Sequence, residues 1–307
     1  MLKHLKHTQI DQKKWDKCLL GSADAVVYCQ SWFLNIIHPG WEALVIEKQE
    51  SYTFIMPLLH DKKYGLSIHP KPVLAQRLGM FGLVNSELTK EIKKQIEKLF
   101  ASFIYPLSQH YSNDFCQEEK INHILPLSAD YTNLQLQYRR DRKTRLKQAK
   151  NAHIEIVEAH NANEMISLLK EEVSPKISGG VSSSSFSKIH DIITESLNNK
   201  SGFLVKAIHD NQLISIAFFI TYKNRITYLF SANTKLGRSL QANTLILDTI
   251  IKQYAGSHYI LDFEGSHISG IADFFKGFGA EEEKYFHIKY ESPSIKVLKK
   301  IKSIIRR

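Results

Sequence analysis

Two acidic side chains, Asp262 and Glu264, stand two residues apart in a short apolar segment near the C-terminus. The segment predicts a strand over 259–263, and residues two apart on a strand point to the same face of its sheet. A carboxylate there can accept the proton of an attacking amine or hold a cationic substrate. Asp262 and Glu264 are therefore candidates for catalysis. The alternatives are a buried, hydrogen-bonded acid at Asp262 and a turn cap at Glu264.

A polar loop at 233–240 follows a predicted strand and opens a predicted helix. Such a loop presents free backbone N–H groups and the positive end of a helix dipole, which suits it to bind a pyrophosphate. Lys235 and Arg238 add positive charge that would neutralise phosphates. An ordinary turn at the start of a helix is the alternative. The residues predicted to bind a donor molecule are Thr234, Lys235, Gly237, Arg238 and Ser239.

The elements that must position these residues follow from hydrophobic periodicity. The turn His209–Asp210–Asn211–Gln212 favours a hairpin between the first two strands of the second half. A serine-rich segment at 181–187 predicts a loop. The predicted order is β-β-β-loop-α-β-α-β, with strands at 202–208, 213–222, 226–230, 259–263 and 284–290, and helices at 240–254 and 269–276.

The first half reads as a shorter version of the second. It has predicted strands at 43–47 and 52–59, then a predicted helix over 87–104, and a basic helix over 132–150 connects it to the second half. The pattern predicts an α/β (α+β) fold of two similar modules, each a mixed and mostly antiparallel sheet flanked by helices. The expected domains are 1–150, 151–291 with the donor site, and a tail helix at 292–307.

Length and composition agree with two globular modules. The 307 residues are 43% hydrophobic and 23% charged, which excludes disorder as the dominant state. The chain has neither a secretory leader nor an apolar run of about 20 residues, so a cytoplasmic protein is expected. The cysteines form no C-x-x-C pair and the histidines no H-E-x-x-H motif, so unpaired thiols and no metal are expected.

The net charge of +10 is concentrated in two segments, at 137–150 and 292–307. Each carries a net charge of +6, and the rest of the chain sums to −2. The tail places Ile295, Leu298 and Ile301 at helical spacing among lysines, which predicts a basic amphipathic helix. Both segments are candidate contacts for tRNA or for an anionic membrane surface, which would place the protein at the inner membrane face. Solvated or body-packed helices are the alternatives.

Several motifs together resemble the FemAB-like branch of the GNAT (GCN5-related N-acetyltransferase) superfamily. The loop resembles the Q/R-x-x-G-x-G/A motif of acyl-CoA-dependent members at Gly237 and Ser239, although the leading Gln or Arg is missing. Further similarity lies in LKQAK at 146–150, LDFEGS at 261–266 and FFKGFGA at 274–280. The resemblance implies tandem acetyltransferase-like modules, the first often without a donor site, and acyl transfer to an amine.

The chain departs from both reaction types of these relatives at one position. Counting back four residues from Gly279 places Phe275 where many acyl-CoA-dependent members carry a Tyr that protonates the leaving thiol. In the relatives that form peptidoglycan bridges, the position equivalent to 275 is the Lys of a Phe-Lys pair. Here Lys276 follows one residue later, rotated by about 100° on a helix. Lys276 is a third catalytic candidate. Other candidate proton donors are Tyr228, Tyr254 and Tyr285.

Three functions are consistent with these features. The first is an N-acyltransferase that moves an acyl group from an acyl-CoA donor to a small-molecule or cell-envelope amine, without a covalent enzyme intermediate. The second is an aminoacyl-tRNA-dependent transferase acting on a peptidoglycan precursor. The third is a non-catalytic tandem module that binds an anionic surface.

Overall fold

A computed structural model of the chain describes residues 1–109, 115–265, 269–297 and 300. These residues form two compact units. The first is built from residues 1–120 and the segment from 284 onward, and the second from 121–283. The predicted boundaries at 150 and 291 differ from this division because the helix before residue 150 packs in the second unit, whereas the last strand pairs in the first.

The first unit carries two sets of strands. Its elements are β1 (Leu2–Leu5), α1 (Gln12–Leu20), α2 (Ser31–Ile37), β2 (Glu42–Lys48), β3 (Ser51–Leu58), β4 (Asp61–Lys63), β5 (Leu66–His69), β6 (Phe81–Gly82), α3 (Ser86–Leu99) and β7 (Ser102–Leu107). One set is antiparallel in the order β1-β2-β3-β6. The other runs β4-β5-β7 and continues to the last strand, with β5 and β7 parallel. The strands predicted at 43–47 and 52–59 are confirmed as β2 and β3.

The second unit has a longer sheet. Its elements are α4 (Tyr131–Leu136), α5 (Arg140–Asn151), β9 (Glu155–Ala159), α6 (Ala162–Glu172), α7 (Ser183–Asn198), β10 (Gly202–His209), β11 (Gln212–Tyr222), β12 (Arg225–Asn233), α8 (Lys235–Ser239), α9 (Ala242–Tyr254), β13 (Ile260–Asp262) and α10 (Ser269–Lys276). The chain enters this unit through β8 (Cys116–Pro126) and leaves it through β14 (Glu281–Glu291).

The sheet of the second unit runs in the order β8-β13-β12-β11-β10-β9. Its neighbouring strands are antiparallel except for β12 and β13, which are parallel. The turn between β10 and β11 has Asp210 and Asn211 at φ 48° and 60°, as the predicted hairpin requires. The mixed, mostly antiparallel sheet confirms the predicted fold class.

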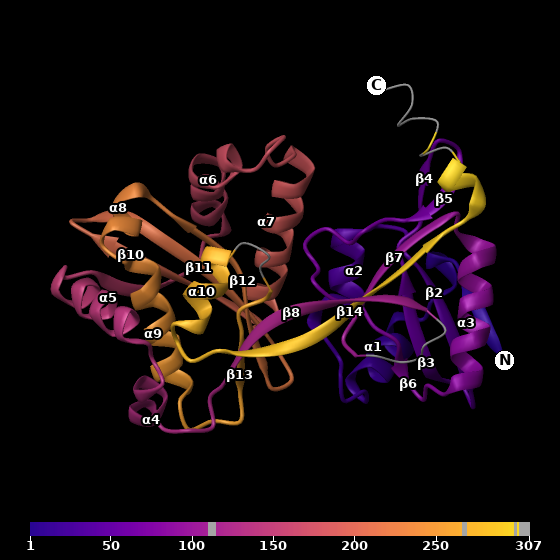
Figure 1. Cartoon of the computed structure of the whole chain (residues 1–307), viewed down its shortest axis with the longest axis horizontal. Helices are drawn as coiled ribbons and strands as arrows, with labels where there is room; N and C mark the ends of the chain where they lie inside the picture. The colour runs from indigo at the N-terminus through magenta and orange to yellow at the C-terminus, as the bar shows by residue number, and fades with distance from the viewer. Residues whose placement is uncertain (110–114, 266–268, 298–299, 301–307) are drawn as a thin grey trace. The chain divides into compact units, whose positions relative to one another are not determined.

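Helices cover both faces of this sheet (Figure 1). Helix α9 packs on β10 and β11, and α5 packs against α9. On the other face α6 contacts β11 and β12, and α7 contacts β10. The face under α9 holds the main apolar core of the unit, with Phe219, Ile246 and Leu261 completely buried. The sheet and α9 therefore form a rigid support for the residues at the ends of β12.

Three local predictions are wrong, each for a physical reason. The helix predicted over 87–104 ends at Leu99, because 102–107 form β7 and bury Phe103 and Tyr105 on one face of the strand. The predicted serine loop instead begins α7, where the Ser182 hydroxyl accepts a hydrogen bond from the Ser185 amide. The predicted connector helix is divided into α4 and α5.

Within the described part of the chain, no helix has both the length and the apolar character needed to cross a bilayer. Residues 293–297 are helical, as the tail prediction requires, and Ile295 is buried in the first unit. The remainder of the predicted tail helix, 298–299 and 301–307, lies outside the described residues.

Candidate functional site

The candidate site lies at the end of β12 that extends beyond its pairing with β13. Among the described residues, strands β12 and β13 pair from Arg225 with Ile260 to Thr227 with Asp262 and no further. Strand β13 then ends, whereas β12 continues to Asn233. Side chains on the second half of β12 therefore have no parallel neighbour beside them. In open α/β sheets, the space beyond the carboxyl end of a strand at such a point is where ligands bind.

A β-bulge turns three polar residues of β12 to the same side. Phe218 pairs with Phe230 and Phe219 pairs with Tyr228, so Leu229 is an extra residue in the ladder. An extra residue shifts the alternation of side chains by one position. Tyr228, Ser231 and Asn233 consequently line one cavity together.

This cavity has a volume of about 470 Å³ and lies between β12, the start of α9, α5 and α10. Its wall contains two arginines, Arg145 and Arg238, and among the described residues it contains no carboxylate. Phe274 and Phe275 supply an apolar side. The other lining residues are Tyr228, Ser231, Asn233, Gly237, Gln241, Asn243, Thr244, Gly270 and Ile271. The combination suits a ligand with an anionic part and an apolar part.

The predicted donor loop lies at the wall of the cavity. The Thr234 hydroxyl accepts a hydrogen bond of 2.9 Å from the Gly237 amide and donates one of 3.2 Å to the Ile214 carbonyl, which starts α8. A Cβ atom at Gly237 would overlap the Ile214 carbonyl oxygen. Glycine at 237 is therefore required for β11 and the loop to pack this closely.

The other predicted donor-binding residues differ in their positions. Arg238 lines the cavity and pairs with Glu172 at 2.9 Å, on the exposed surface. Lys235 and Ser239 are exposed and do not belong to the cavity lining. The Ser239 hydroxyl donates to the Leu236 carbonyl at 2.8 Å. Of the predicted loop residues, the structure thus brings Gly237 and Arg238 to the cavity, with Thr234 as the helix cap behind them.

Tyr228 is the candidate proton donor inside the cavity. Its side chain is 7% exposed, and its hydroxyl donates to Asn243 Oδ1 at 2.9 Å. Burial raises the pKa of Tyr228 to about 12, and hydrogen bonds with Ser231 and Asn243 oppose this rise. The phenol is therefore protonated at neutral pH, so it carries a proton that a leaving group could take. Tyr254 and Tyr285 do not line this cavity.

Asp262 is the buried member of a partly buried ion-pair cluster at the opposite end of β12. It is 1% exposed, pairs with Arg225 at 2.6 Å and accepts from Asn122 at 3.0 Å. Arg225 also pairs with Glu283 at 2.7 Å. Although burial alone would lower it, the two carboxylates raise the pKa of Arg225 above its usual value. The cluster joins the starts of β12 and β14 to the end of β13.

Glu264 and Lys276 complete the sequence-predicted set. The expectation that Glu264 shares a strand face with Asp262 is wrong, because β13 ends at Asp262 and Glu264 has φ 57°. Instead, the Glu264 amide donates to Asp262 Oδ1 at 2.9 Å, so Asp262 shapes the turn that carries Glu264. Lys276 pairs with Glu282 at 2.6 Å, and both side chains are nearly half exposed. Neither Glu264 nor Lys276 lines the cavity.

Phe275 occupies a central position among the aromatic side chains of the site. Its ring stacks on Phe263 at 4.8 Å and meets Tyr228 edge-on at 6.2 Å between centroids. The phenol of Tyr228 on β12 is thus a direct neighbour of the position that the family register assigns to a Tyr.

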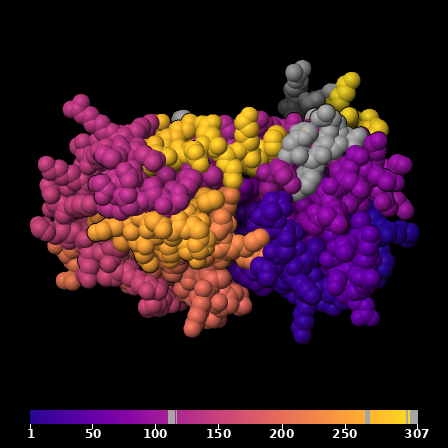
Figure 2. Space-filling model, turned by 90° about the horizontal axis from the view of Figure 1, so that it is seen from below, coloured from indigo at the N-terminus to yellow at the C-terminus, as the bar shows by residue number. Residues whose placement is uncertain are grey.

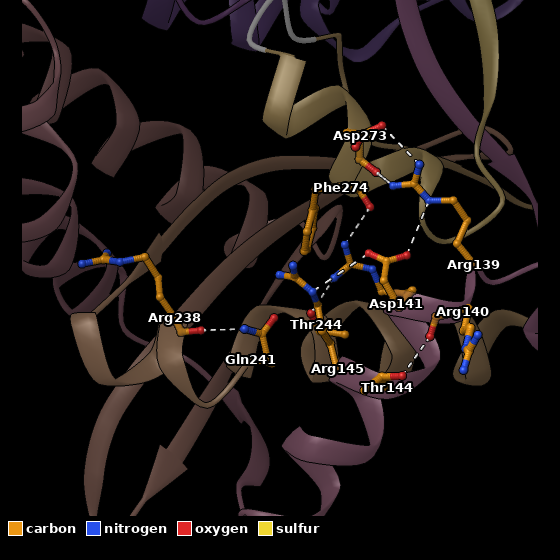
Figure 3. Close-up of polar contacts among 11 residues, drawn as sticks. Arg139, Arg140, Asp141, Thr144, Arg145, Arg238, Gln241, Thr244, Asp273 and Phe274 are labelled. Carbon is orange, nitrogen blue, oxygen red and sulfur yellow. Dashed lines mark hydrogen bonds and ion pairs between the residues drawn. The ribbon is translucent and has the colours of Figure 1, made fainter.

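Sequence reasoning missed the contributions of α5 and α9 to the site. Arg145 lies in the basic segment that was predicted to bind a partner, so its charge was a usable signal. Asn243 and Thr244 lie in the first turn of a predicted helix, where their side chains give no distinctive pattern. Figure 3 shows Arg145, Thr244 and Phe274 close together, with Gln241 and Arg238 on the α8 side.

No protein-family model and no curated protein sequence matches the chain. Solved structures do match it over nearly its whole length. FemX aligns at a TM-score of 0.64 with 13% identity, covering 92% of this chain and 96% of FemX. A tandem GNAT protein from the clavulanic acid biosynthesis pathway aligns at 0.53 with 11% identity, covering 94% of this chain and 98% of that one. A GNAT-family acetyltransferase from Colwellia psychrerythraea aligns at 0.53 with 9% identity, covering 95% and 100%. The chain therefore shares its fold with FemX and with these GNAT proteins, as its motifs predicted.

Proposed function

We propose that the protein is an N-acyltransferase whose second unit binds an acyl-CoA-type donor and transfers the acyl group to an amine by direct attack. The observation that carries this proposal is the cavity between β12, α9 and α10. The cavity wall contains arginines and an aromatic side, and no carboxylate among the described lining residues. This wall matches a ligand in which an anionic carrier is joined to a short apolar group. The similarity of the fold to GNAT proteins supports the same reaction class.

The residues present fit such a donor. Gly237 has no side chain, so the backbone of the loop itself forms the cavity wall at this position. Arg145 and Arg238 offset negative charge on phosphates at the rim. Inside, Ser231 and Asn243 offer hydrogen bonds, and Phe275 packs beside the transferred group. The donor supplies an acyl carbonyl activated as a thioester.

The chemistry then requires one proton acceptor and one proton donor. As the amine nitrogen bonds to the acyl carbon, the carbon–sulfur bond breaks and the thiolate needs a proton, which the Tyr228 hydroxyl supplies. We assign the amine proton to Glu264, whose turn is shaped by Asp262. Lys276 is the candidate for orienting the acceptor. No covalent bond to the enzyme forms.

An aminoacyl-tRNA donor is the second candidate, and the exposed side of α5 favours it. Arg140, Lys143 and Lys147 are exposed there, and Asp141 is the single acid of the helix. Figure 2 shows magenta atoms beside orange atoms on the face it presents, and α5 packs against α9. Nucleic acid bound along this side would bring its end to the same cavity. A peptidoglycan precursor would then be the acceptor.

The deciding experiment is calorimetric titration of the full chain with CoA, acetyl-CoA and tRNA at two salt concentrations. The proposal expects 1:1 binding of CoA in the micromolar range, and loss of this binding in Gly237→Asp, which crowds and repels phosphate. Unchanged CoA affinity in Gly237→Asp would refute the loop assignment.

Salt-sensitive tRNA binding without CoA binding would instead favour the second candidate. The double variant Arg140→Ala, Lys147→Ala should then bind tRNA more weakly. Absence of both would contradict both donors and favour a non-catalytic module.

A further inference from the structure

Arg142 is a buried cation without a carboxylate partner. It projects from α5, is 2% exposed and makes no ion pair within 4.0 Å with any described residue. The adjacent Asp141 pairs with Arg139 at 3.7 Å and Arg145 at 4.0 Å instead. Burial is the main reason that the pKa of Arg142 is lowered to about 10. The guanidinium is still charged at neutral pH, so its charge needs another source of stabilisation.

Apolar and weakly polar groups surround this guanidinium. Its carbon lies 4.2 Å from the Phe274 ring centre and 4.8 Å from that of Phe278, both cation–π contacts. A Cβ atom at Gly277 would lie 2.9 Å from Nε, so glycine makes room for it. Nε itself has no hydrogen-bond partner among the described residues. The shorter hydrogen bond of the guanidinium runs from Nη1 to Thr244 Oγ1 at 2.9 Å, and Nη2 donates to the Phe274 carbonyl at 3.4 Å.

Thr244 connects this charge to the cavity. It lies in the first turn of α9, is 1% exposed and forms part of the cavity wall. Its hydroxyl oxygen accepts from Arg142, and its proton is donated to no described residue. A threonine inside a helix commonly donates to the carbonyl four residues earlier, as Thr249 does to Leu245 at 2.8 Å. Thr244 does not, so its proton is available to a ligand.

A buried cation without a counter-ion costs free energy unless a bound anion compensates for it. Because Arg142 withdraws electron density from the Thr244 oxygen, the hydroxyl is a stronger donor than a free threonine. The first turn of α9 adds the positive end of its dipole in the same place. The charge, the hydroxyl and the dipole all favour a negative oxygen at this part of the wall.

We propose that Thr244 Oγ1 donates a hydrogen bond to an anionic oxygen of the cavity ligand, a phosphate or carboxylate oxygen, and that Arg142 is the positioning residue that polarises this hydroxyl. The inference rests on the proposed function in one respect, that the same cavity receives the donor. It adds an anchoring point on α9 to the predicted loop at 234–239.

The test is calorimetric titration of the full chain with sodium pyrophosphate, sodium succinate and CoA. In Thr244→Val the proposal expects at least about tenfold weaker binding of the probe that uses the site, because a hydrogen bond to a charged group is lost. Thr244→Ser keeps the hydroxyl and should bind within about threefold of the unaltered protein. Arg142→Met should weaken binding similarly, and the double variant should be no weaker than either single one.

The outcomes separate this inference from the proposed donor. Pyrophosphate or succinate binding that depends on Thr244, without CoA binding, would uphold the anchoring residue and overturn the donor. CoA binding that is equal in Thr244→Val would overturn the inference and leave the donor in place. Binding of none of the three probes would overturn both. A preference for pyrophosphate over succinate would identify the anionic group as a phosphate, and the reverse as a carboxylate.

Discussion

Arg225 is partly buried and Arg142 is buried in the second unit, and they lie in opposite surroundings. At the start of β12, Arg225 is held by the carboxylates of Asp262 and Glu283, at 2.6 and 2.7 Å, and its pKa is raised. Near the cavity, Arg142 has aromatic rings and one hydroxyl as its main contacts, and its pKa is lowered to about 10.

The difference separates a structural charge from one that is available to a ligand. The charge of Arg225 is neutralised by carboxylates within the fold, so this cation ties the strands together and is not available to a bound anion. The charge of Arg142 is not neutralised by any described residue, and the group in contact with it, Thr244, lines a cavity. The start of β12, which pairs with β13, therefore supports the fold, and its other end lines the cavity.

The largest expected effect comes from breaking the cluster. Arg225→Met leaves the buried carboxylate of Asp262 and the partly exposed carboxylate of Glu283 without their partner, so the free energy of unfolding should fall by about 3–5 kcal/mol. The matched variant Arg142→Met removes an uncompensated charge, so its free energy of unfolding should change by less than about 1 kcal/mol. Urea denaturation of both variants measures these values. Equal losses of stability would contradict the distinction between the two arginines.

Tyr228→Phe tests the open end of β12. Loss of the proton donor should lower kcat about 100-fold with little change in KM, because the ring still packs in the cavity. Since the pKa of Tyr228 is raised to about 12, activity of the unaltered protein that depends on this proton should persist through pH 10 and fall only above it. Acyl-transfer assays over a range of pH measure this alkaline decrease in activity. A variant with unaltered kcat would assign the proton to another group.

Gly237→Ala examines the close packing of the loop. The added methyl group meets the Ile214 carbonyl oxygen, so the variant should lose about 1–3 kcal/mol of stability and bind the donor more weakly. Gly270→Ala is the control, because Gly270 also lines the cavity but has open space at its Cβ position. Thermal unfolding and titration with CoA compare the two. Similar behaviour of both variants would show that the loop can shift at no cost.

The smallest change in stability is expected when Lys276 is substituted. Its pair with Glu282 is exposed, so Lys276→Met should change the free energy of unfolding by at most about 1 kcal/mol. If Lys276 orients the acceptor, the same variant raises the KM for the amine severalfold. Steady-state kinetics with varied amine distinguish this role from a purely surface ion pair, which would leave KM unaltered.

Much of the second unit was predictable because its strands are apolar and end in recognisable turns. The hairpin around His209, helix α9 and the mixed, mostly antiparallel fold class follow from local patterns. The bulge at Leu229 was not predictable, because its neighbours are apolar residues that fit a regular strand equally well. Without the bulge, the shared orientation of Tyr228, Ser231 and Asn233 could not be inferred.

The sequence by itself determined the apolar periodicity, the loop glycine and the chemical types at the candidate positions, because these depend on neighbouring residues. Only the tertiary structure decided which acid is neutralised and which cation is not. Asp262 meets Arg225 across 37 positions of chain, and Arg142 meets Thr244 across 102. Such pairings depend on which strands and helices pack together, so the same residue types become part of the support in one place and part of a binding cavity in another.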